Sequence, residues 1–139
     1  MSYLLGLLSR NRRGVAVTEF ALVLPPLALL LLGIFGYGQY FLLAHSVQQI
    51  ANNAARATIA GLSTPERKTL AEAAVDSEVA HLPDVKTHQY WVDVDEPGNL
   101  VKVTVTINAA SNPLFQMSLV PMPDAVIKRQ GVVRKGGIE

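Results

Sequence analysis

The stretch RRGVAVTEF at residues 12–20 is the part of the chain on which the fold and the function depend. Its last two residues, Glu19 and Phe20, open an apolar run, and residues 20–44 contain no charged side chain. As an α-helix this run is about 37 Å long, which is enough to cross a bilayer with some tilt. A carboxylate at the mouth of a membrane span is costly, so Glu19 requires a partner.

The charge is distributed unevenly on the two sides of this run. The chain of 139 residues carries twelve Lys and Arg against eleven Asp and Glu. Three arginines and no acid precede Gly14, which leaves nine basic residues against eleven acids beyond it (12 − 3 = 9): Arg10, Arg12, Arg13. A basic surface for nucleic acid is therefore not indicated. By the positive-inside rule the arginines stay in the cytoplasm, and the C-terminal part lies across the membrane.

The helix predicted for the apolar run continues well beyond it. Val47, Ile50, Ala51 and Ala54 recur at spacings of three and four, and no helix breaker follows until Gly61. We therefore predict one helix over residues 15–60, half in lipid and half in water, ended by Gly61 at its C-cap.

Prolines and small residues mark particular positions of this helix. Pro25 and Pro26 should kink it locally, because each proline removes a backbone donor. Small side chains let another helix or sheet approach closely, and we assign this packing role to four residues: Gly33, Gly36, Ala51 and Ala54. The alternative for the glycines is the ordinary composition of a transmembrane segment.

Beyond Gly61 the pattern predicts a small α+β domain. A second helix begins at Thr64 as its N-cap, with Pro65 in the first turn, and ends before Pro83. Ser63-Thr64-Pro65-Glu66 also fits a capping box. Residues 88–95 and 100–108 alternate between apolar and polar side chains and predict a β-hairpin, with Pro97-Gly98 at the centre of a type II turn. Residues 112–123 predict a packed irregular loop. Residues 126–134 predict a last strand, bulged near Gly131.

The segment from Gly14 to Pro25 resembles known sequences. Gly-x-x-x-x-Glu-Phe, after basic residues and before a long apolar run, resembles the processing motif of type IV prepilin-like proteins. The fuller stretch GVAVTEFALVLP, with NNAARA at residues 52–57, is similar to the TadE-like (TadE/TadF) minor pseudopilins of the tight-adherence (Tad/Flp) pilus. The resemblance is strongest over residues 12–60 and diffuse beyond them.

This resemblance implies a reaction performed on the chain. A prepilin peptidase at the cytoplasmic face of the bacterial inner membrane would cut between Gly14 and Val15. The free amine of a neighbouring subunit could then neutralise Glu19, so the resemblance assigns Glu19 and Phe20 to assembly. The implied partners are that peptidase, other pilin or pseudopilin subunits and the assembly machinery, and the membrane itself. The implied organisation is a leader at 1–14, a transmembrane and stalk helix at 15–61, and a small extracytoplasmic domain at 62–139.

Other functional groups are sparse. The three histidines lack a paired spacing for a metal, no cysteine occurs, and no catalytic triad order or nucleotide-binding loop is present, so we expect neither a cofactor nor enzymatic activity. A weak cation site at Asp93 and Asp95 is less favoured than a solvated hairpin face. Trp91 lies on the same strand face as these acids, and we expect it to pack rather than to stand in solvent.

Two other functions remain open at this stage. The chain could be an uncleaved, signal-anchored periplasmic binding module, in which Gly14 is a loop glycine and Glu19 reaches the headgroups. It could instead be an exported enzyme released by a signal peptidase near Ser46, although the apolar run is long for a signal peptide and the helix continues through that position.

Overall fold

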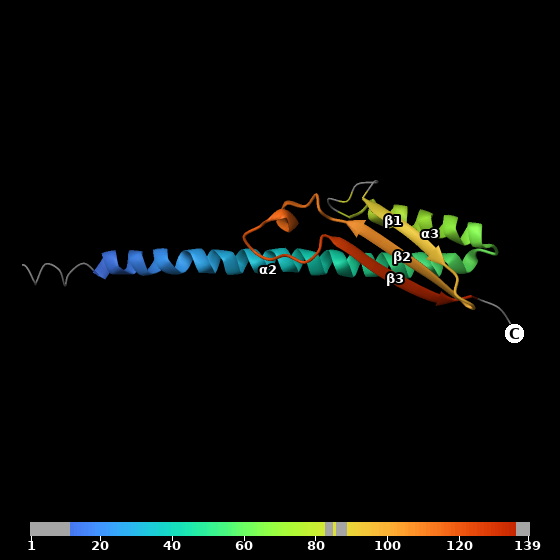
Figure 1. Ribbon diagram of the computed structural model, residues 1–139, viewed down its shortest axis with the longest axis horizontal. Coiled ribbons are helices and arrows are strands. Elements are labelled where there is room, and N and C mark those ends of the chain that lie inside the picture. Colours follow the sequence, from blue (N-terminus) through green and yellow to red (C-terminus); the bar gives the residue numbers. More distant parts are fainter. Residues whose placement is uncertain (1–11, 83–84, 86–88, 136–139) are drawn as a thin grey trace, which may run out of the picture. The chain divides into compact units, whose positions relative to one another are not determined.

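The computed structural model describes residues 12–82, 85 and 89–135. Helix α2 covers Arg12–Ala57 and passes into the short 3₁₀ helix η1, Thr58–Ala60. Helix α3 covers Thr64–Val79. Three strands follow, β1 (Tyr90–Asp95), β2 (Leu100–Asn108) and β3 (Val126–Arg134), and the 3₁₀ helix η2 (Pro113–Gln116) lies between the last two (Figure 1). The predicted α+β fold is confirmed.

The chain divides into two compact units, residues 1–35 and residues 36–139. In the first unit the described chain is the N-terminal part of α2, and its side chains from Gly14 to Leu31 are exposed. Its most apolar window of eighteen residues has a mean hydropathy of 2.2 and none of it is buried. Within the described residues α2 is the one helix long and apolar enough to cross a membrane, which is compatible with a single-pass anchor.

The second unit is built on an antiparallel sheet with the order β1-β2-β3. Ile107 of the central strand pairs with Tyr90 on one side and with Ile127 on the other, so these three side chains share one face. On this face the alternate residues of β2 are fully or almost fully buried: Val101, Val103, Val105, Ile107. The inward face predicted for β2 from the alternation is therefore confirmed.

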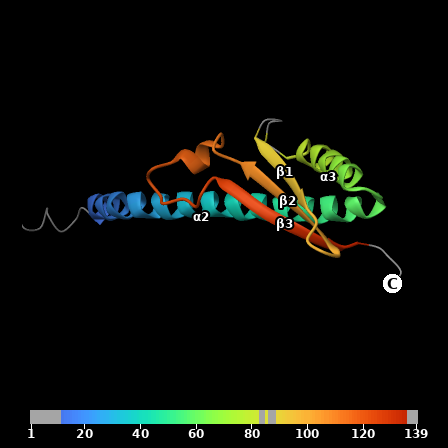
Figure 2. The same cartoon turned by 45° about the vertical axis from the view of Figure 1, so that its right-hand side comes forward.

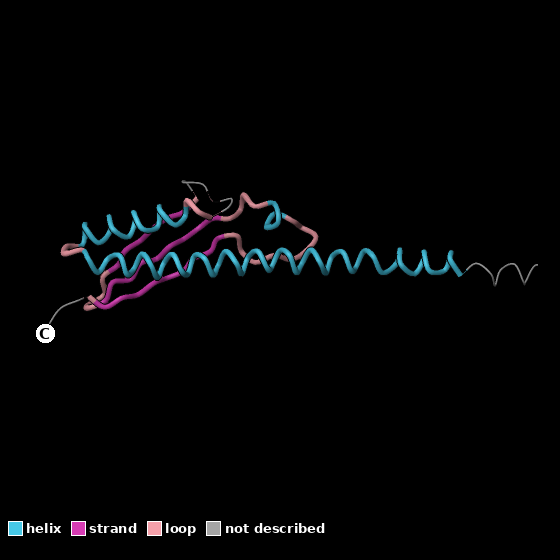
Figure 3. The backbone as a smooth tube through the Cα atoms, turned by 180° about the vertical axis from the view of Figure 1, so that it is seen from behind, coloured by secondary structure: helices cyan, strands magenta, loops and turns pink. Residues whose placement is uncertain are grey.

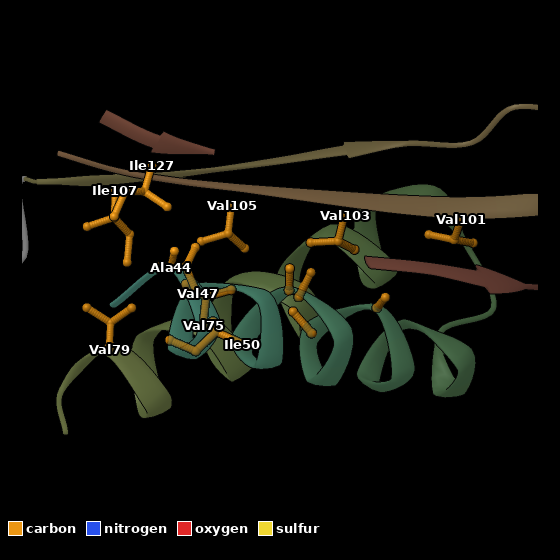
Figure 4. Packing of buried hydrophobic residues seen from close by; sticks show 14 residues of the cluster. Ala44, Val47, Ile50, Val75, Val79, Val101, Val103, Val105, Ile107 and Ile127 are labelled. Carbon is orange, nitrogen blue, oxygen red and sulfur yellow. The ribbon is translucent and has the colours of Figure 1, made fainter. Parts of the chain in front are cut away.

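Both helices lie on that same face of the sheet (Figure 3). Ala44, Val47 and Ile50 of α2 and Val75 and Val79 of α3 point toward the strands, as Figure 4 shows. The C-terminal part of α2 is thus an element of the domain core. Its burial removes apolar surface from water, which is the main favourable contribution to the stability of such a small unit.

Gly131 marks the closest approach between α2 and the sheet. A Cβ atom at this position would overlap the carbonyl oxygen of Ala51, and Ala51 itself is fully buried. Beside this contact the Nε2 of Gln48 donates a hydrogen bond to the carbonyl oxygen of Gln130 at 2.8 Å. The pairing of β3 with β2 continues without interruption through Gly131, so the predicted bulge is wrong. The glycine is present because the helix backbone leaves no room for a side chain.

The ends of the helices differ in detail from the prediction. Gly61 is the C-cap, as predicted, but its backbone is extended rather than left-handed, with φ −80° and ψ 134°. Its N–H donates a hydrogen bond to the carbonyl oxygen of Thr58 and closes η1. Its lack of a side chain instead makes room for Arg67, since a Cβ would come 2.7 Å from the Cγ of that residue. The N-cap of α3 is Ser63 rather than Thr64, with Ser63 Oγ accepting from the N–H of Glu66 at 3.4 Å. Pro25 and Pro26 lie inside α2.

The predictions for the hairpin turn and for the sheet face opposite the helices also require correction. Leu100 donates its N–H to the carbonyl of Pro97, so the central residues of the turn are Gly98 and Asn99, one position later than predicted. Gly98 has a φ of +61°, which a glycine adopts without strain. Trp91 is 56% exposed, so its predicted packing is wrong, whereas Thr104 on the same face is only 5% exposed between Asp93 and Gln130.

Replacing Gly131 by alanine should lower the free energy of unfolding by about 2 kcal/mol, because the added methyl group forces the helix and the strand apart. The measurement is urea unfolding of the full chain in detergent micelles, followed by circular dichroism. Gly38→Ala is the matched control, since a Cβ at that helical position meets no atom within 4 Å. Equal stability of the two variants would show that the close contact is absent.

Candidate functional site

The predicted processing and assembly residues lie together near the start of the described part of α2. Gly14, Val15, Glu19 and Phe20 are all helical and exposed. Thr18 donates its hydroxyl to the carbonyl of Val15 at 2.8 Å, so its polar group is satisfied within the helix. Among the described residues none forms a hydrogen bond or an ion pair with the carboxylate of Glu19. Its partner, if it has one, must come from outside the described chain.

Around Glu19 the helix surface is almost wholly apolar. Val17 is 67% exposed and Leu22 is 79% exposed, and large exposed apolar side chains continue to the end of the first unit: Val23, Leu24, Leu27, Leu29, Leu30, Leu31, Ile34, Phe35. An exposed apolar surface of this length is typical of a lipid-facing helix or of a helix that packs against other helices. Glu19 is the only charged residue in α2 between Gly14 and Ala55.

The four residues assigned to helix packing serve different contacts. Ala51 and Ala54 are fully buried and form part of the core of their own domain. Gly36 is buried against the loop that follows β2, because a Cβ there would lie 2.7 Å from the Cε of Met122. Gly33 is half-buried. The described chain therefore uses three of these small residues in contacts of its own.

A cluster of charges that sequence reasoning missed joins three elements at the end of the domain. Glu96, in the turn after β1, accepts a hydrogen bond from Lys135 Nζ at 2.6 Å and from Arg67 Nη1 at 3.1 Å. Its side chain is only 13% exposed. The hydrogen bond from Lys135, with further contributions from Thr64 and Arg67, holds the pKa of Glu96 below its ordinary value. No spacing in the sequence connects residues 67, 96 and 135, so only the fold reveals this cluster.

The remaining candidates form no chemical site. In the described part of the chain, no group of three or more His, Asp and Glu side chains is placed to hold a metal. His45 contacts Gln49 at 3.0 Å and His81 contacts the carbonyl oxygen of Ser77 at 2.8 Å, while His88 lies outside the described residues. Asp95 pairs with Lys102 at 3.4 Å across the hairpin.

These features define a class of small protein in which an exposed apolar N-terminal helix continues into the core of an α+β domain and carries one carboxylate near its start. A family model described as TadE-like protein matches residues 14–56, which confirms the predicted resemblance over that segment. The match covers about a third of the chain, and over this segment the chain is similar to TadE-like proteins. Comparison with the curated proteins and with the solved structures gave no match.

Acid should destabilise the domain through Glu96. Its folded pKa lies below the reference value of 4.5, so its stabilising effect is complete above about pH 4.5 and is lost as the pH falls through the folded pKa. Urea unfolding of the full chain in micelles between neutral and acidic pH measures this loss. Glu96→Gln should be less stable than the parent chain at neutral pH and should depend less on pH.

The matched control for that experiment is Glu72→Gln, because Glu72 forms a long 3.9 Å pair with Lys68 in which both side chains are about half exposed. This control should retain both the stability and the acid dependence of the parent chain. If Glu96→Gln retained them as well, the charge cluster would contribute nothing to stability.

Proposed function

We propose that the chain is a minor pilin or pseudopilin that takes part in assembly of a Tad-class type IV pilus, with a structural rather than an enzymatic role. The observation that carries the proposal is the family match over residues 14–56, which begins at Gly14 and contains Glu19 as its only charge before Arg56. A prepilin peptidase at the cytoplasmic face of the inner membrane removes residues 1–14. The domain that contains the sheet then lies on the periplasmic side.

The cut changes the electrostatic surroundings of Glu19. In the uncut chain α2 begins at Arg12, so Glu19 is the eighth helical residue and lies beyond the first turns. Hydrolysis of the Gly14–Val15 peptide bond leaves a carboxylate on Gly14 and a free amine on Val15. Glu19 then becomes the fifth residue of the helix, about 6 Å along the axis from the new N-terminus. The positive end of the helix dipole and the cationic amine both favour a carboxylate at this place.

The same amine supplies a partner for a neighbouring chain. When two processed helices lie side by side in the bilayer, the amine of one can pair with Glu19 of the other, and the pair neutralises both charges in a medium where isolated charges are costly. The apolar side chains around Glu19 are exposed and uncommitted to the domain core, which leaves them free for lateral contact with other pilin subunits and with the assembly machinery. Because the pair forms only when the amine of one helix lies beside Glu19 of the other, it favours this alignment of the two helices over other offsets.

Replacing Glu19 by glutamine should leave membrane insertion intact but abolish co-purification with other pilin subunits, because the uncharged amide cannot pair with the amine. Glu19→Ala should behave in the same way. The measurement is affinity purification from detergent-solubilised membranes, with the recovered subunits compared by immunoblotting. Glu72→Gln, a change of the same chemistry on the exposed surface of α3, is the control and should retain co-purification.

Undiminished recovery of pilin subunits with both Glu19 variants would contradict the assembly role of this residue. That result would favour the permanently anchored binding module, which tolerates loss of the charge.

A further inference from the structure

The loop between β2 and β3 is unusual for the surface of a domain because it has no charge. No charged residue occurs between Lys102 and Asp124. The loop proper, residues 112–123, reads NPLFQMSLVPMP and carries η2 near its start. Leu119 is 70% exposed, and the other residues of the loop are half-buried or exposed. Loops at a protein–water surface are normally polar, so this composition calls for a reason.

The loop lies along α2 at residues 36–40, as Figure 2 shows. The hydroxyl of Tyr37 donates a hydrogen bond to the carbonyl oxygen of Pro121 at 2.8 Å. Tyr40 and Phe115 meet edge to face with ring centroids 6.3 Å apart. Met122 covers Gly36, where a side chain on the helix would collide with its sulfur. Three separate contacts therefore hold the loop against the same two turns of helix.

If α2 crosses the membrane as proposed, residues 36–40 lie near its outer surface. A helix rises about 26 Å from Glu19 to Gly36 and about 32 Å from Glu19 to Tyr40, while the hydrocarbon core of a bilayer is about 30 Å thick. If Glu19 stays at the inner edge of the core, Gly36 is still inside it and Tyr40 reaches its outer edge. A tilted helix would place both residues deeper. Tyrosines at these positions agree with the preference of tyrosine for the interface.

We propose that residues 112–123 form a second membrane contact, in which Leu119 and its neighbours insert into the outer leaflet beside the span. The proposal rests on the proposed crossing of the membrane by α2. The loop contacts α2 at Tyr37 and Tyr40, and it presents no charge that insertion would bury. Beside it opens a hollow of mixed lining, with apolar side chains from Leu42, Leu43, Leu82 and Phe115 and polar ones from Gln39, Ser46 and Asn112.

Lipid is a better occupant for this surface than a second protein chain. The first charged residue after the loop is Asp124. Its Oδ1 accepts a hydrogen bond from the backbone N–H of Val126 at 3.0 Å, so this carboxylate is already paired within its own segment. The loop therefore offers exposed apolar side chains without the charged rim that commonly orients a protein partner. Anchoring at a second point restrains the domain close to the bilayer, where a single helix alone would let it tilt.

Tryptophan quenching by brominated lipids tests the proposal directly. Trp91 is the only tryptophan, so Trp91→Phe removes the background. Into this chain we would place Leu119→Trp in the loop, Leu29→Trp in the span and Leu62→Trp at the distal end of the domain, where Leu62 is 91% exposed. Each full-length variant is reconstituted in phosphatidylethanolamine and phosphatidylglycerol vesicles with acyl chains brominated either near the headgroup or near the chain end.

The expected result is strong quenching of Leu119→Trp by bromine near the headgroup and weak quenching by bromine near the chain end. The brominated lipids should also quench the fluorescence of Leu29→Trp. Neither lipid should quench the fluorescence of Leu62→Trp. Quenching of Leu29→Trp without quenching of Leu119→Trp would overturn the second contact while leaving the span intact. Blue-shifted but unquenched emission from Leu119→Trp would mean that a protein chain covers the loop. No quenching of Leu29→Trp would remove the span and the proposal together.

Discussion

The close contact between Ala51 of α2 and Gly131 of β3 is the constraint on which the C-terminal unit depends. Small side chains along one face of α2 let its backbone approach the sheet, and Gly131 removes the last obstacle where the strand passes beneath the helix. Helix α3 then closes the remaining part of the same sheet face. One consequence reaches beyond packing. The helix whose N-terminal part is apolar and exposed also supplies part of the domain core, so the candidate membrane span and the folded domain share a single element.

Much of this architecture follows from periodicity in the sequence. The spacing of Val47, Ile50, Ala51 and Ala54 and the alternation from Leu100 to Asn108 correctly placed the core face of α2 and of β2, because burial on one side imposes those periods. Predictions from local sequence patterns were wrong where the structure depends on a segment far away in the chain. Gly131 suggested a bulge, but its role is to accommodate a helix eighty residues earlier. Trp91 suggested packing, but no element covers its face of the sheet among the described residues.

The candidate site likewise contains some features that local sequence reveals and others that only the fold reveals. Gly14 and Glu19 could be recognised from sequence because their spacing, basic flank and apolar continuation are all local, and the family match covers that segment. The ion cluster at Glu96 and the loop contact at Tyr37 could not be recognised, since each joins residues that are far apart in the chain. The ion cluster links α3, the hairpin turn and the end of β3, and the contact at Tyr37 holds an uncharged loop against α2.

The central claim is that the chain becomes an assembly subunit when the bond after Gly14 is cut, since this cut provides the amine that Glu19 needs. The most direct test is intact-protein mass spectrometry of the chain extracted from membranes of cells with and without an active prepilin peptidase. We predict a chain that begins at Val15 when the peptidase is active and a chain that retains residues 1–14 when it is not. An intact leader in the presence of active peptidase, or a soluble fragment that begins near Val47, would contradict the account.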